Sequence, residues 1–341
     1  MHPPELARVV RLHGRRDLRL HHERPPVPDP GRGEVLVRVT AVGLCGSDRH
    51  WFEEGSIGES VLAGAFVPGH ELIGVIEGGA RAGERVAVDP ADPCGRCELC
   101  LAGRGRLCPL IRFAGFPPTD GGLREWLAWP SARCHPIPDG IGDEEATLLE
   151  PLGVALHAVD LAGARAATSA GVHGVGPIGL AVVAVLRAQG VVDIIASDPL
   201  PHRLAAARTM GAKPIEAIGG HGPGTVASVQ VDVAFECSGT DAGLEQAIRA
   251  TRPGGRIVLV GIPEGDRTSF PASAARRKEL ALLLSRRMEA GDLERAVALV
   301  AGGTVILRHL VTHRYPLAEA AEAFDALADR RGLKVVVLPW A

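Results

Sequence analysis

The sequence contains no run of about 18 apolar residues, the length that a bilayer-spanning helix needs. Its first sixteen residues, MHPPELARVVRLHGRR, also lack the apolar core of a signal peptide. We therefore expect a cytoplasmic protein that has no membrane partner.

Strong charge of either sign is absent as well. The formal net charge is -3 over 341 residues, and the Lys and Arg residues are scattered along the chain. The basic runs Arg276–Lys278 and Arg286–Arg287 are too short to indicate a surface for nucleic acid or an anionic membrane. Internal repeats are missing too, and the 43 Gly and 26 Pro are dispersed between apolar runs rather than gathered in linkers. We expect no nucleic-acid partner.

Cysteine is scarce, with seven residues, yet four of them lie in the loop 93–109, at Cys94, Cys97, Cys100 and Cys108. A disulfide scaffold is excluded, because such chains are small, secreted and rich in cysteine. The spacing C-x-x-C-x-x-C with a fourth Cys eight residues later favours one Zn²⁺ held by four thiolates in a closed, structural site. An iron–sulfur cluster is an alternative, although the spacing differs from that of ferredoxins. Four unrelated reduced cysteines are the other alternative.

Two domains are expected, because 341 residues exceed what one hydrophobic core normally serves. In the first half, Glu34–Val42 alternates apolar and other residues as a half-buried strand does, and shorter strand-like runs follow at Leu72–Ile76 and Glu84–Val88. These patterns predict a compact, mostly β lobe. Near the end of the chain, Leu293–Val300 and Leu317–Leu327 are typical of amphipathic helices. A closing strand, Leu333–Leu338, is expected to pack back on the first lobe.

After Pro151, strand-like and helical segments alternate, which predicts an α/β domain with a doubly wound parallel sheet. The expected strands are Ser169–His173, Asp193–Ser197, Val231–Cys237 and Arg256–Val260, and the expected helices are Pro177–Gln189, Pro201–Met210 and Asp241–Ala250. The first of these strands, within TSAGVHG, is unusually small and polar for a central parallel strand.

A glycine pattern, Gly174-Val-Gly176-Pro-Ile-Gly179, joins the first of these strands to the first helix, which is the context of a dinucleotide-binding turn. Gly174 would allow the tight turn, Gly176 would let the backbone approach a pyrophosphate, and Gly179 would let helix and strand pack closely. The helix N-terminus then presents unpaired N–H groups to the phosphates. The alternative is a glycine turn that binds no ligand.

A carboxylate follows this turn at the end of the next strand, IIASD, where Asp198 lies nineteen residues after Gly179. It can accept hydrogen bonds from both hydroxyls of an adenosine ribose and would repel a 2′-phosphate, which favours NAD over NADP. Arg203 complicates this interpretation, because an arginine can pair with a phosphate. We expect its side chain to lie against the adenine.

A second set of metal ligands is separated along the chain. Cys45 lies in VGLCGSDRHW, and His70-Glu71 lies in PGHELIG. A thiolate, an imidazole and a carboxylate all bind zinc, and three protein ligands would leave a position for water or substrate. Taken singly, a cysteine is more often a small buried apolar residue, and a histidine a hydrogen-bonded polar one.

With these motifs, the sequence resembles the zinc-dependent medium-chain alcohol and polyol dehydrogenases over nearly its whole length. The segments that carry the resemblance are GLCGSDRH, VPGHELIGVIEGG, the four-cysteine loop, PPTDGGLREW, LLEPLGVALHAV, GVGPIGL, FECSGT, GGRIVLVG and THRYPLAEAAEAF. PPTDGG and EPLGVALHA are most similar to the sorbitol, xylitol and threonine dehydrogenase branch. The resemblance implies a GroES-like, mostly β catalytic domain (1–152 plus 290–341) and a Rossmann NAD-binding domain (153–289).

The resemblance also implies roles for individual residues around a catalytic zinc. Cys45, His70 and Glu71 match its ligands, and Glu150 matches a carboxylate that reaches the metal directly or through water, so which glutamate coordinates stays open. Ser47 and His50 match a proton relay that runs from the serine hydroxyl to the nicotinamide ribose hydroxyl and then to the histidine at the surface. Asp48 matches a carboxylate that orients the zinc-bound histidine, with a solvated loop residue as the alternative.

Further matches concern the cofactor and the substrate. Cofactor contacts are implied for the turn and for the strand ends that follow it: Gly174, Gly176, Pro177, Ile178, Gly179, Asp198, Arg203, Ser238, Val260, Ile262 and Lys334. Substrate contacts are implied for a second set, Ser47, Trp51, Ile57, Phe113, Glu150 and Arg287. Trp51 stands where these enzymes often carry Tyr, which puts sorbitol itself in doubt.

Together these features predict an enzyme with two zinc ions per subunit that oxidises a small secondary alcohol and transfers hydride to NAD. The expected substrate is a polyol, cyclitol, amino alcohol or hydroxy amino acid. One alternative is a reductase of ketones or aldehydes, and another is a non-catalytic nucleotide-binding relative. The resemblance also implies a homodimer or homotetramer, in which the apolar run Leu280–Leu284 could pair across subunits.

Overall fold

The computed structural model of the chain describes residues 3–164, 169–215 and 230–341. The chain separates into two compact units, Met1–Glu150 with Glu289–Ala341, and Pro151–Met288. Each unit has its own hydrophobic core. Throughout the described ranges, every helix is too short or too polar to cross a bilayer.

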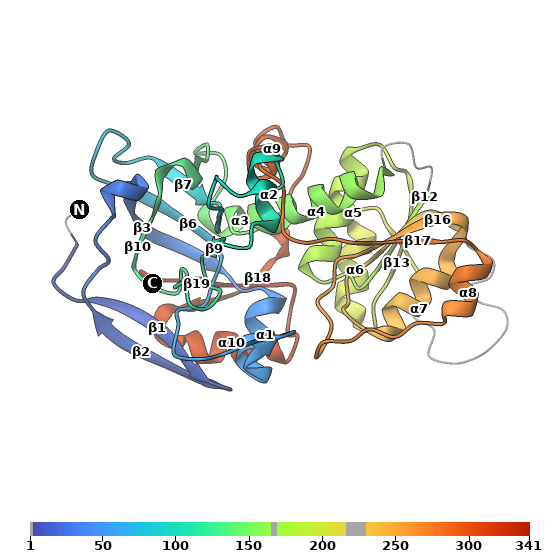
Figure 1. The fold of residues 1–341 in the computed structure, drawn as a ribbon, viewed down its shortest axis with the longest axis horizontal. Helices are drawn as coiled ribbons and strands as arrows, with labels where there is room; N and C mark the ends of the chain where they lie inside the picture. Colours follow the sequence, from blue (N-terminus) through green and yellow to red (C-terminus); the bar gives the residue numbers. More distant parts are fainter. Residues whose placement is uncertain (1–2, 165–168, 216–229) are drawn as a thin grey trace. The chain divides into compact units, whose positions relative to one another are not determined.

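The first unit is built on a seven-stranded sheet in the order β11-β7-β6-β3-β19-β18, in which β10 also pairs with β3 (Figure 1). Its strands are β3 (Glu34–Gly43), β6 (Glu71–Glu77), β7 (Arg85–Val88), β10 (Trp126–Pro130), β11 (Cys134–Pro136), β18 (Val311–Pro316) and β19 (Lys334–Leu338). Alternate residues of β3, including Val37 and Val39, are completely buried, as the period-two pattern requires. The mostly β lobe predicted from the sequence is confirmed.

The C-terminal segment returns to this first unit. β19 runs antiparallel to β3, with Val337 opposite Val42, and parallel to β18. Two of the predicted helices are present as α9 (Asp292–Ala301) and α10 (Ala320–Ala328), and α10 packs on β18 and β19. α10 lies beside α1 (Gly46–Glu54), where the rings of Phe52 and Phe324 are 5.2 Å apart. The last strand is therefore part of the sheet that leads into α1.

Shorter elements complete the first unit. They are the hairpin β1 (Ala7–Gly14) and β2 (Asp17–Glu23), the pair β4 (Ser56–Ile57) and β5 (Ser60–Val61), the pair β8 (Ala91–Asp92) and β9 (Arg112–Phe113), and the helices α2 (Glu98–Leu101) and α3 (Asp143–Ala146). β8 and β9 enclose the four-cysteine loop. α4 (Leu149–Ala162) begins at the junction with the second unit.

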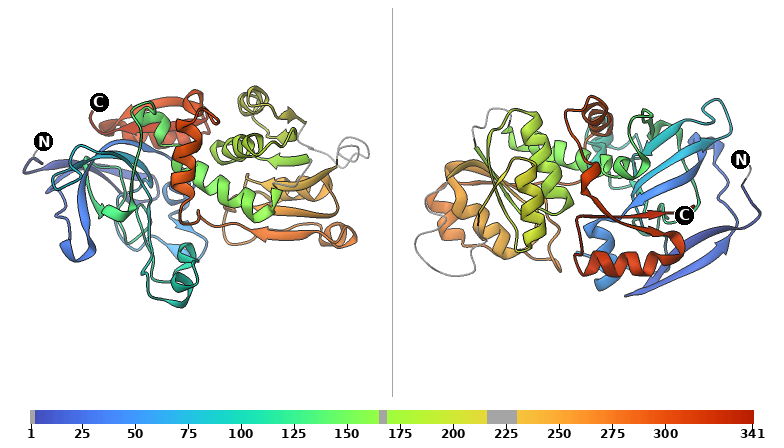
Figure 2. Two further views of the ribbon diagram at one scale, coloured as in Figure 1. Left: turned by 90° about the horizontal axis from the view of Figure 1, so that it is seen from above. Right: turned by 180° about the vertical axis from the view of Figure 1, so that it is seen from behind.

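The second unit is a six-stranded parallel sheet in the order β14-β13-β12-β15-β16-β17. Its strands are β12 (Ser169–His173), β13 (Asp193–Ser197), β14 (Lys213–Pro214), β15 (Val231–Glu236), β16 (Thr251–Leu259) and β17 (Ala281–Leu284). The helices are α5 (Pro177–Ala188), α6 (Pro201–Thr209), α7 (Asp241–Ala250) and α8 (Ala272–Arg277). Figure 2 shows α5 and α6 on one face of this sheet and α7 and α8 on the other. This is the doubly wound order predicted from the β-α-β alternation.

The small, polar strand β12 lies at the centre of this sheet, between β13 and β15. Ala170 and Val172 are fully buried, and their size lets α5 and α7 pack closely on the strand. The buried ring of His173 forms a hydrogen bond between its Nδ1 and Oγ of Ser197 on β13, at 2.8 Å. Its Nδ1 is therefore satisfied inside the sheet by the neighbouring strand, whereas its Nε2 is buried without a hydrogen-bond partner among the residues that the structure describes.

Candidate active site and metal centres

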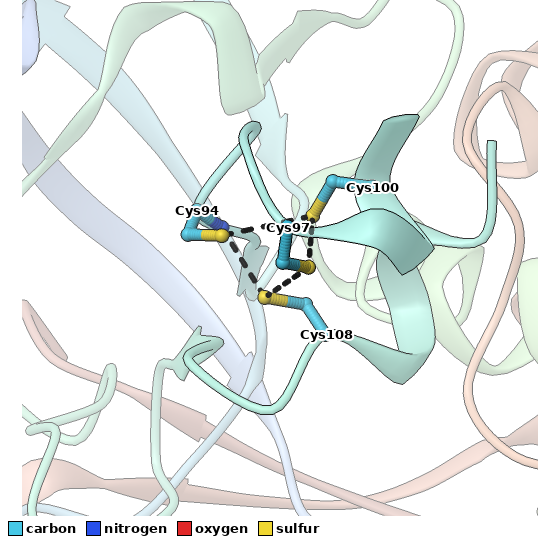
Figure 3. Close-up of side chains that lie close together, drawn as sticks. All are labelled: Cys94, Cys97, Cys100 and Cys108. Atoms are coloured by element: carbon cyan, nitrogen blue, oxygen red, sulfur yellow. Dashed lines mark hydrogen bonds between the residues drawn. The ribbon is translucent and has the colours of Figure 1, made fainter. Parts of the chain in front are cut away.

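The four cysteines of the loop converge on one point (Figure 3). Sγ of Cys97 lies 3.4 Å from Sγ of Cys100 and 3.8 Å from Sγ of Cys108, and Sγ of Cys94 lies 4.0 Å from that of Cys100. Four sulfurs bound tetrahedrally to one zinc at about 2.3 Å lie about 3.8 Å apart, so the observed spacing fits this metal. A hydrogen bond from the backbone N–H of Arg96 lowers the pKa of Cys94 to about 6, which favours the thiolate.

The base of this loop is fixed to the main sheet by Arg112. Its guanidinium pairs with Asp92 at 2.7 Å and with Glu34 at 3.0 Å, and it lies 5.2 Å from the ring centroid of Trp129. Trp129 in turn donates its Nε1–H to the carbonyl of Asp89. A metal held by the four thiols would therefore cross-link a loop whose two ends are already anchored.

Three residues that are distant in the sequence form a second cluster. The ligand atoms of Cys45, His70 and Glu71 all lie within 4.8 Å of one another. The pairing of β3 with β6 explains this, since Gly43 lies opposite Glu71 and Cys45 follows two residues later. His70 and Glu71 are buried, at 6% and 1% exposure. A sulfur, a nitrogen and an oxygen donor fit zinc, and three ligands leave one position open.

Asp48 ties the two ligand segments together. Its side chain is completely buried, and one carboxylate oxygen accepts the N–H of Cys45 at 2.9 Å while the other accepts the N–H of Gly69 at 3.2 Å. Nδ1 of His70 lies 3.8 Å from the same Asp48 oxygen that Gly69 uses. Burial raises the pKa of Asp48. The residue is therefore a buried brace between the ligands rather than a solvated loop residue.

Lys334 lies against the same cluster, with 1% of its surface exposed. Its ammonium group pairs with the carboxylate of Glu71 and donates to the carbonyl of Leu44 at 3.1 Å. Its predicted contact with cofactor phosphates stays a prediction, because in this structure the ammonium group is directed at Glu71.

Gly43 is a residue that sequence reasoning misses. A Cβ there would overlap a carboxylate oxygen of Glu71 and would lie 2.8 Å from Cε of Lys334. Only glycine fits beneath this ion pair. The one signal in the sequence is a glycine at the end of a strongly apolar strand, two residues before the ligand Cys45.

Glu150 is a neighbour of the cluster and lies in the first turn of α4, with 7% of its surface exposed. Burial raises its pKa to about 7; the charge of Glu71 adds to this effect, while His70 and Lys334 oppose it. Among the described residues, the close cluster comprises Cys45, His70 and Glu71, without Glu150. In this structure Glu150 thus acts on the ligands through its charge.

The predicted substrate residues fall into different environments. The ring of Phe113 lies 5.6 Å from that of His70, so Phe113 borders the metal cluster. Trp51 is only 1% exposed and packs edge-on against Phe66 and Phe116, which makes it a core residue. Ile57 on β4 and Ser47 in the first turn of α1 are half-buried. Arg287 belongs to the second unit, just after β17.

His50 differs from the sequence expectation of a surface histidine. It is 4% exposed and lies within α1. Its Nδ1 lies 2.6 Å from a carboxylate oxygen of Glu54, one helical turn later. Sequence reasoning does not single out Glu54, and the i, i+4 spacing from His50 is its only signal.

In the second unit, the glycine turn has the backbone that the motif requires. Gly174 has φ of +88°, and a Cβ there would lie 2.6 Å from the backbone nitrogen of Ser238. A Cβ on Gly179 would overlap the carbonyl oxygen of Gly174, so helix and turn can approach only through glycine. Gly176 is the N-cap of α5, which starts with Pro177 and Ile178. The helix N-terminus is thus positioned to bind phosphate.

Asp198 links this turn to the end of β13. Its carboxylate is 4% exposed and accepts two backbone N–H groups, from Val175 and from Leu200, each at 2.9 Å. Nη1 of Arg203 lies 3.8 Å from the oxygen that accepts from Val175, and the guanidinium lies beside Gly176. Two hydrogen bonds and a nearby cation therefore fix this carboxylate, and its contact with the ribose stays a prediction.

The remaining predicted cofactor residues follow the carboxyl ends of the neighbouring strands. Ser238 comes after β15, where its N–H and hydroxyl bind the buried carboxylate of Glu236. Val260 and Ile262 come after β16; Val260 donates its N–H to the carbonyl of Glu236, and Ile262 is 41% exposed. The turn, Asp198 and these loops share one edge of the parallel sheet, which is where such sheets bind ligands.

Comparison with known proteins gives matches to both units. Residues 31–139 match the family described as alcohol dehydrogenase GroES-like domain, and residues 177–302 match zinc-binding dehydrogenase. The sorbitol dehydrogenase of Homo sapiens is 36% identical, with 98% of this chain and 96% of that protein covered. "Probable D-xylulose reductase A" of Aspergillus fumigatus is 38% identical, covering 92% of this chain and 91% of that protein.

Solved structures of dehydrogenases are also similar to this chain over nearly its full length. An alcohol dehydrogenase from Escherichia coli, complexed with NADH, is similar at a TM-score of 0.86 and 27% identity, with 98% of this chain and 100% of that chain covered. A zinc-binding dehydrogenase from Sinorhizobium meliloti, bound to NADP, is similar at a TM-score of 0.87 and 30% identity, with the same coverage.

Proposed function

Since the chain belongs to the zinc-containing medium-chain alcohol dehydrogenase family, whose members are NAD(P)-dependent alcohol and polyol oxidoreductases, we propose that it oxidises a small secondary alcohol to a ketone with NAD as hydride acceptor. The observation that carries this proposal is the cluster of Cys45, His70 and Glu71, because its three donors leave a ligand position open.

We assign two zinc ions, one to each cluster. The four-cysteine loop is a closed structural site, and Cys45, His70 and Glu71 would hold the catalytic ion. When bound, that ion supplies a Lewis acid that lowers the pKa of a substrate hydroxyl group. Which of Glu71 and Glu150 completes its coordination depends on Lys334, because the ammonium group competes for the carboxylate of Glu71.

The protein's own residues position the reactants around this site. Asp48 holds the backbones of Cys45 and Gly69, so the sulfur and imidazole donors keep their spacing. Phe113 covers one side of His70 with an apolar ring, which would exclude water from that side. Ser47, in the first turn of α1, would accept the proton released from the alcohol, and His50 on the same helix would receive it next.

For the cofactor, we propose that Gly174, Gly176 and the start of α5 bind the pyrophosphate, and that Asp198 binds the adenosine ribose. The carboxylate supports NAD, because it would lie close to a 2′-phosphate and repel it. Arg203 lies 3.8 Å away and weakens this repulsion, so we expect a preference for NAD rather than an absolute exclusion of NADP.

The substrate class we propose is a polyol or a chemically similar cyclitol, amino alcohol or hydroxy amino acid. This choice is supported by the similarity of the chain to sorbitol dehydrogenases over nearly its full length. The reverse direction, reduction of a ketone, is a second candidate, because one relative carries the name of a reductase.

We also propose a homo-oligomer that pairs through β17. This strand ends the parallel sheet, and Leu284 at its end is 79% exposed. An unpaired apolar edge is a template for a strand from a second copy. Sedimentation of the purified protein tests this, and a monomer mass at all concentrations would contradict it.

The experiment for the activity is NADH formation with a panel of secondary alcohols, before and after metal removal. We expect activity with at least one polyol, its loss on chelation and its return with Zn²⁺. Activity that survives complete loss of zinc would contradict the proposal.

A further inference from the structure

We propose that Glu54 is a catalytic partner of His50. Its carboxylate accepts the N–H of Nδ1, which leaves Nε2 of His50 free to act as a base, and Glu54 then passes the proton from the imidazole to water. This inference rests on the proposed function, because it concerns the route by which the proton of the alcohol leaves the site.

The geometry on α1 carries the proposal. His50 and Glu54 lie one helical turn apart, and Nδ1 of His50 lies 2.6 Å from Oε1 of Glu54. The carboxylate accepts a hydrogen bond from Nδ1–H at this distance, which leaves a lone pair on Nε2. Within the ranges that the structure describes, no hydrogen bond to Nε2 of His50 is present. The imidazole thus has one nitrogen committed to Glu54 and one available.

Burial explains why His50 needs this partner. The histidine is 4% exposed, so its ring has little direct contact with water to which it could pass a proton. The side chain of Glu54 is 29% exposed, so it reaches both the buried ring and the solvent. Glu54 therefore connects a histidine that is not at the surface with water.

The proton transfer balances without any further reactant. The proton released by the alcohol forms a new N–H bond at Nε2, the N–H bond at Nδ1 breaks, and that proton passes to Oε1 of Glu54. Water then removes it from Glu54, which leaves a neutral imidazole protonated at Nε2. The first tautomer is restored when Nε2 gives its proton to water and Nδ1 regains one from water through Glu54, an exchange with no net change in protons.

The arginines near Glu54 pair with other carboxylates, so Glu54 interacts with His50. The adjacent Glu53 pairs with Arg16 at 3.0 Å and with Arg49 at 2.9 Å, and its carbonyl accepts from Arg15. From α10, Asp325 also pairs with Arg16, at 3.3 Å. β4, which packs on α1 as well, contributes Ser56 and Ile57 and no charge. Two consecutive glutamates on one helix therefore have different partners, which provides a matched control.

The test compares E54Q with E53Q in the full-length, zinc-loaded enzyme. In E54Q we expect kcat for alcohol oxidation to fall at least about 3-fold and its pH profile to change, because the amide cannot take the proton from Nδ1 of His50. We expect E53Q to keep the wild-type profile. NMR of the His50 ring nitrogens gives a readout independent of turnover, and the fraction of the Nδ1–H tautomer should fall in E54Q only.

A double-mutant cycle separates this role from a structural one. If Glu54 acts through His50, then E54Q should change kcat less than about 2-fold in an H50Q background. Equal pH profiles and equal populations of the His50 Nδ1–H tautomer in wild type and E54Q would overturn the inference while the proposed function stands. A wild-type enzyme that forms no NADH with any alcohol would overturn both.

Discussion

The two metal clusters of the first unit are built in opposite ways. The closed cluster takes all four ligands from a loop of fifteen residues, and three of its four thiols are partly exposed. The open cluster takes its ligands from two separate segments, and buried polar groups surround it, among them Asp48, Lys334 and Glu150. The first site needs only local turns, whereas the second exists only after β3, β6 and β19 have paired.

This difference indicates what each metal contributes to the protein. The closed cluster contains four equivalent sulfurs and no group that could act on a substrate, so its metal contributes to folding. The open cluster concentrates buried charge around a free coordination position, so its metal contributes to chemistry and offsets that charge. Substitutions in the two clusters should therefore separate activity from stability.

The largest effect is expected for Cys45→Ser. We expect kcat for alcohol oxidation to fall by about 10³-fold, because the Lewis acid is worth several kcal/mol in the transition state. Binding of NADH, measured by fluorescence, should be unchanged, since the glycine turn lies in the second unit. Cys134→Ala, at a buried cysteine outside both clusters, is the control and should retain activity. Full activity of Cys45→Ser would remove the distinction between the clusters.

A second effect concerns pH and the metal-free protein. The pKa of Glu150 is raised to about 7, mainly by burial, from about 4.5. Between these values the folded state holds a proton that the unfolded state has lost, so the contribution of Glu150 to stability is fully present below about pH 4.5 and is lost as the pH rises through about 7. The loss is at most about 3 kcal/mol.

Denaturant unfolding of chelator-treated protein at pH 5 and pH 8 checks this dependence. We expect Glu150→Gln to remove most of the decline that the wild type shows between these values. Glu322→Gln, on the exposed face of α10, is the control and should behave as the wild type does. Identical pH dependence in all three proteins would show that ionisation of Glu150 does not reduce the stability of the metal-free protein.

A smaller effect is expected for Gly43→Ala, because the added Cβ displaces the Glu71–Lys334 pair rather than a ligand sulfur. We expect zinc affinity at the open cluster and kcat/KM to fall about 10-fold, as is typical when partners of metal ligands are disturbed. Competition with a chromogenic chelator measures the affinity. Gly14→Ala, where a Cβ meets nothing within 4 Å, should have no effect. Unchanged affinity in Gly43→Ala would mean that the pair does not position Glu71.

The smallest effect on turnover is expected for Cys97→Ser in the closed cluster. We expect Tm to fall by more than about 5 °C, because loss of a structural metal is a loss of folding energy. The kcat of the folded fraction should change less than about 3-fold. Differential scanning fluorimetry and active-site titration measure the two quantities, and loss of turnover at an unchanged Tm would reverse the assignment of the two clusters.

Sequence reasoning predicts the closed cluster and the architecture well, since both depend on local patterns. The spacing of the four cysteines and the alternation after Pro151 are visible in the printed sequence. The open cluster follows from donor chemistry and from the resemblance to a known family, because Cys45 and His70 are separated by 25 residues. Their proximity depends on the register of β3 and β6, and single residues do not reveal that register.

Other features of the site need the three-dimensional structure. The position of Lys334 depends on the pairing of β19 with β3 at the opposite end of the chain, and the need for glycine at Gly43 follows from it. The burial of His50 and Trp51 depends on how α1 packs on the first unit's core. Amphipathic spacing indicates which face of a helix is apolar, but it does not tell how deeply a polar residue on that helix is buried.

The zinc content of folded wild-type protein and of Cys45→Ser, measured by elemental analysis, tests the central claim most directly. We predict two zinc ions per chain in the active wild type and one in Cys45→Ser, with the four-cysteine site still filled. A fully active wild type with a single zinc, or a Cys45→Ser variant that retains both, would contradict the assignment of a catalytic metal to Cys45, His70 and Glu71.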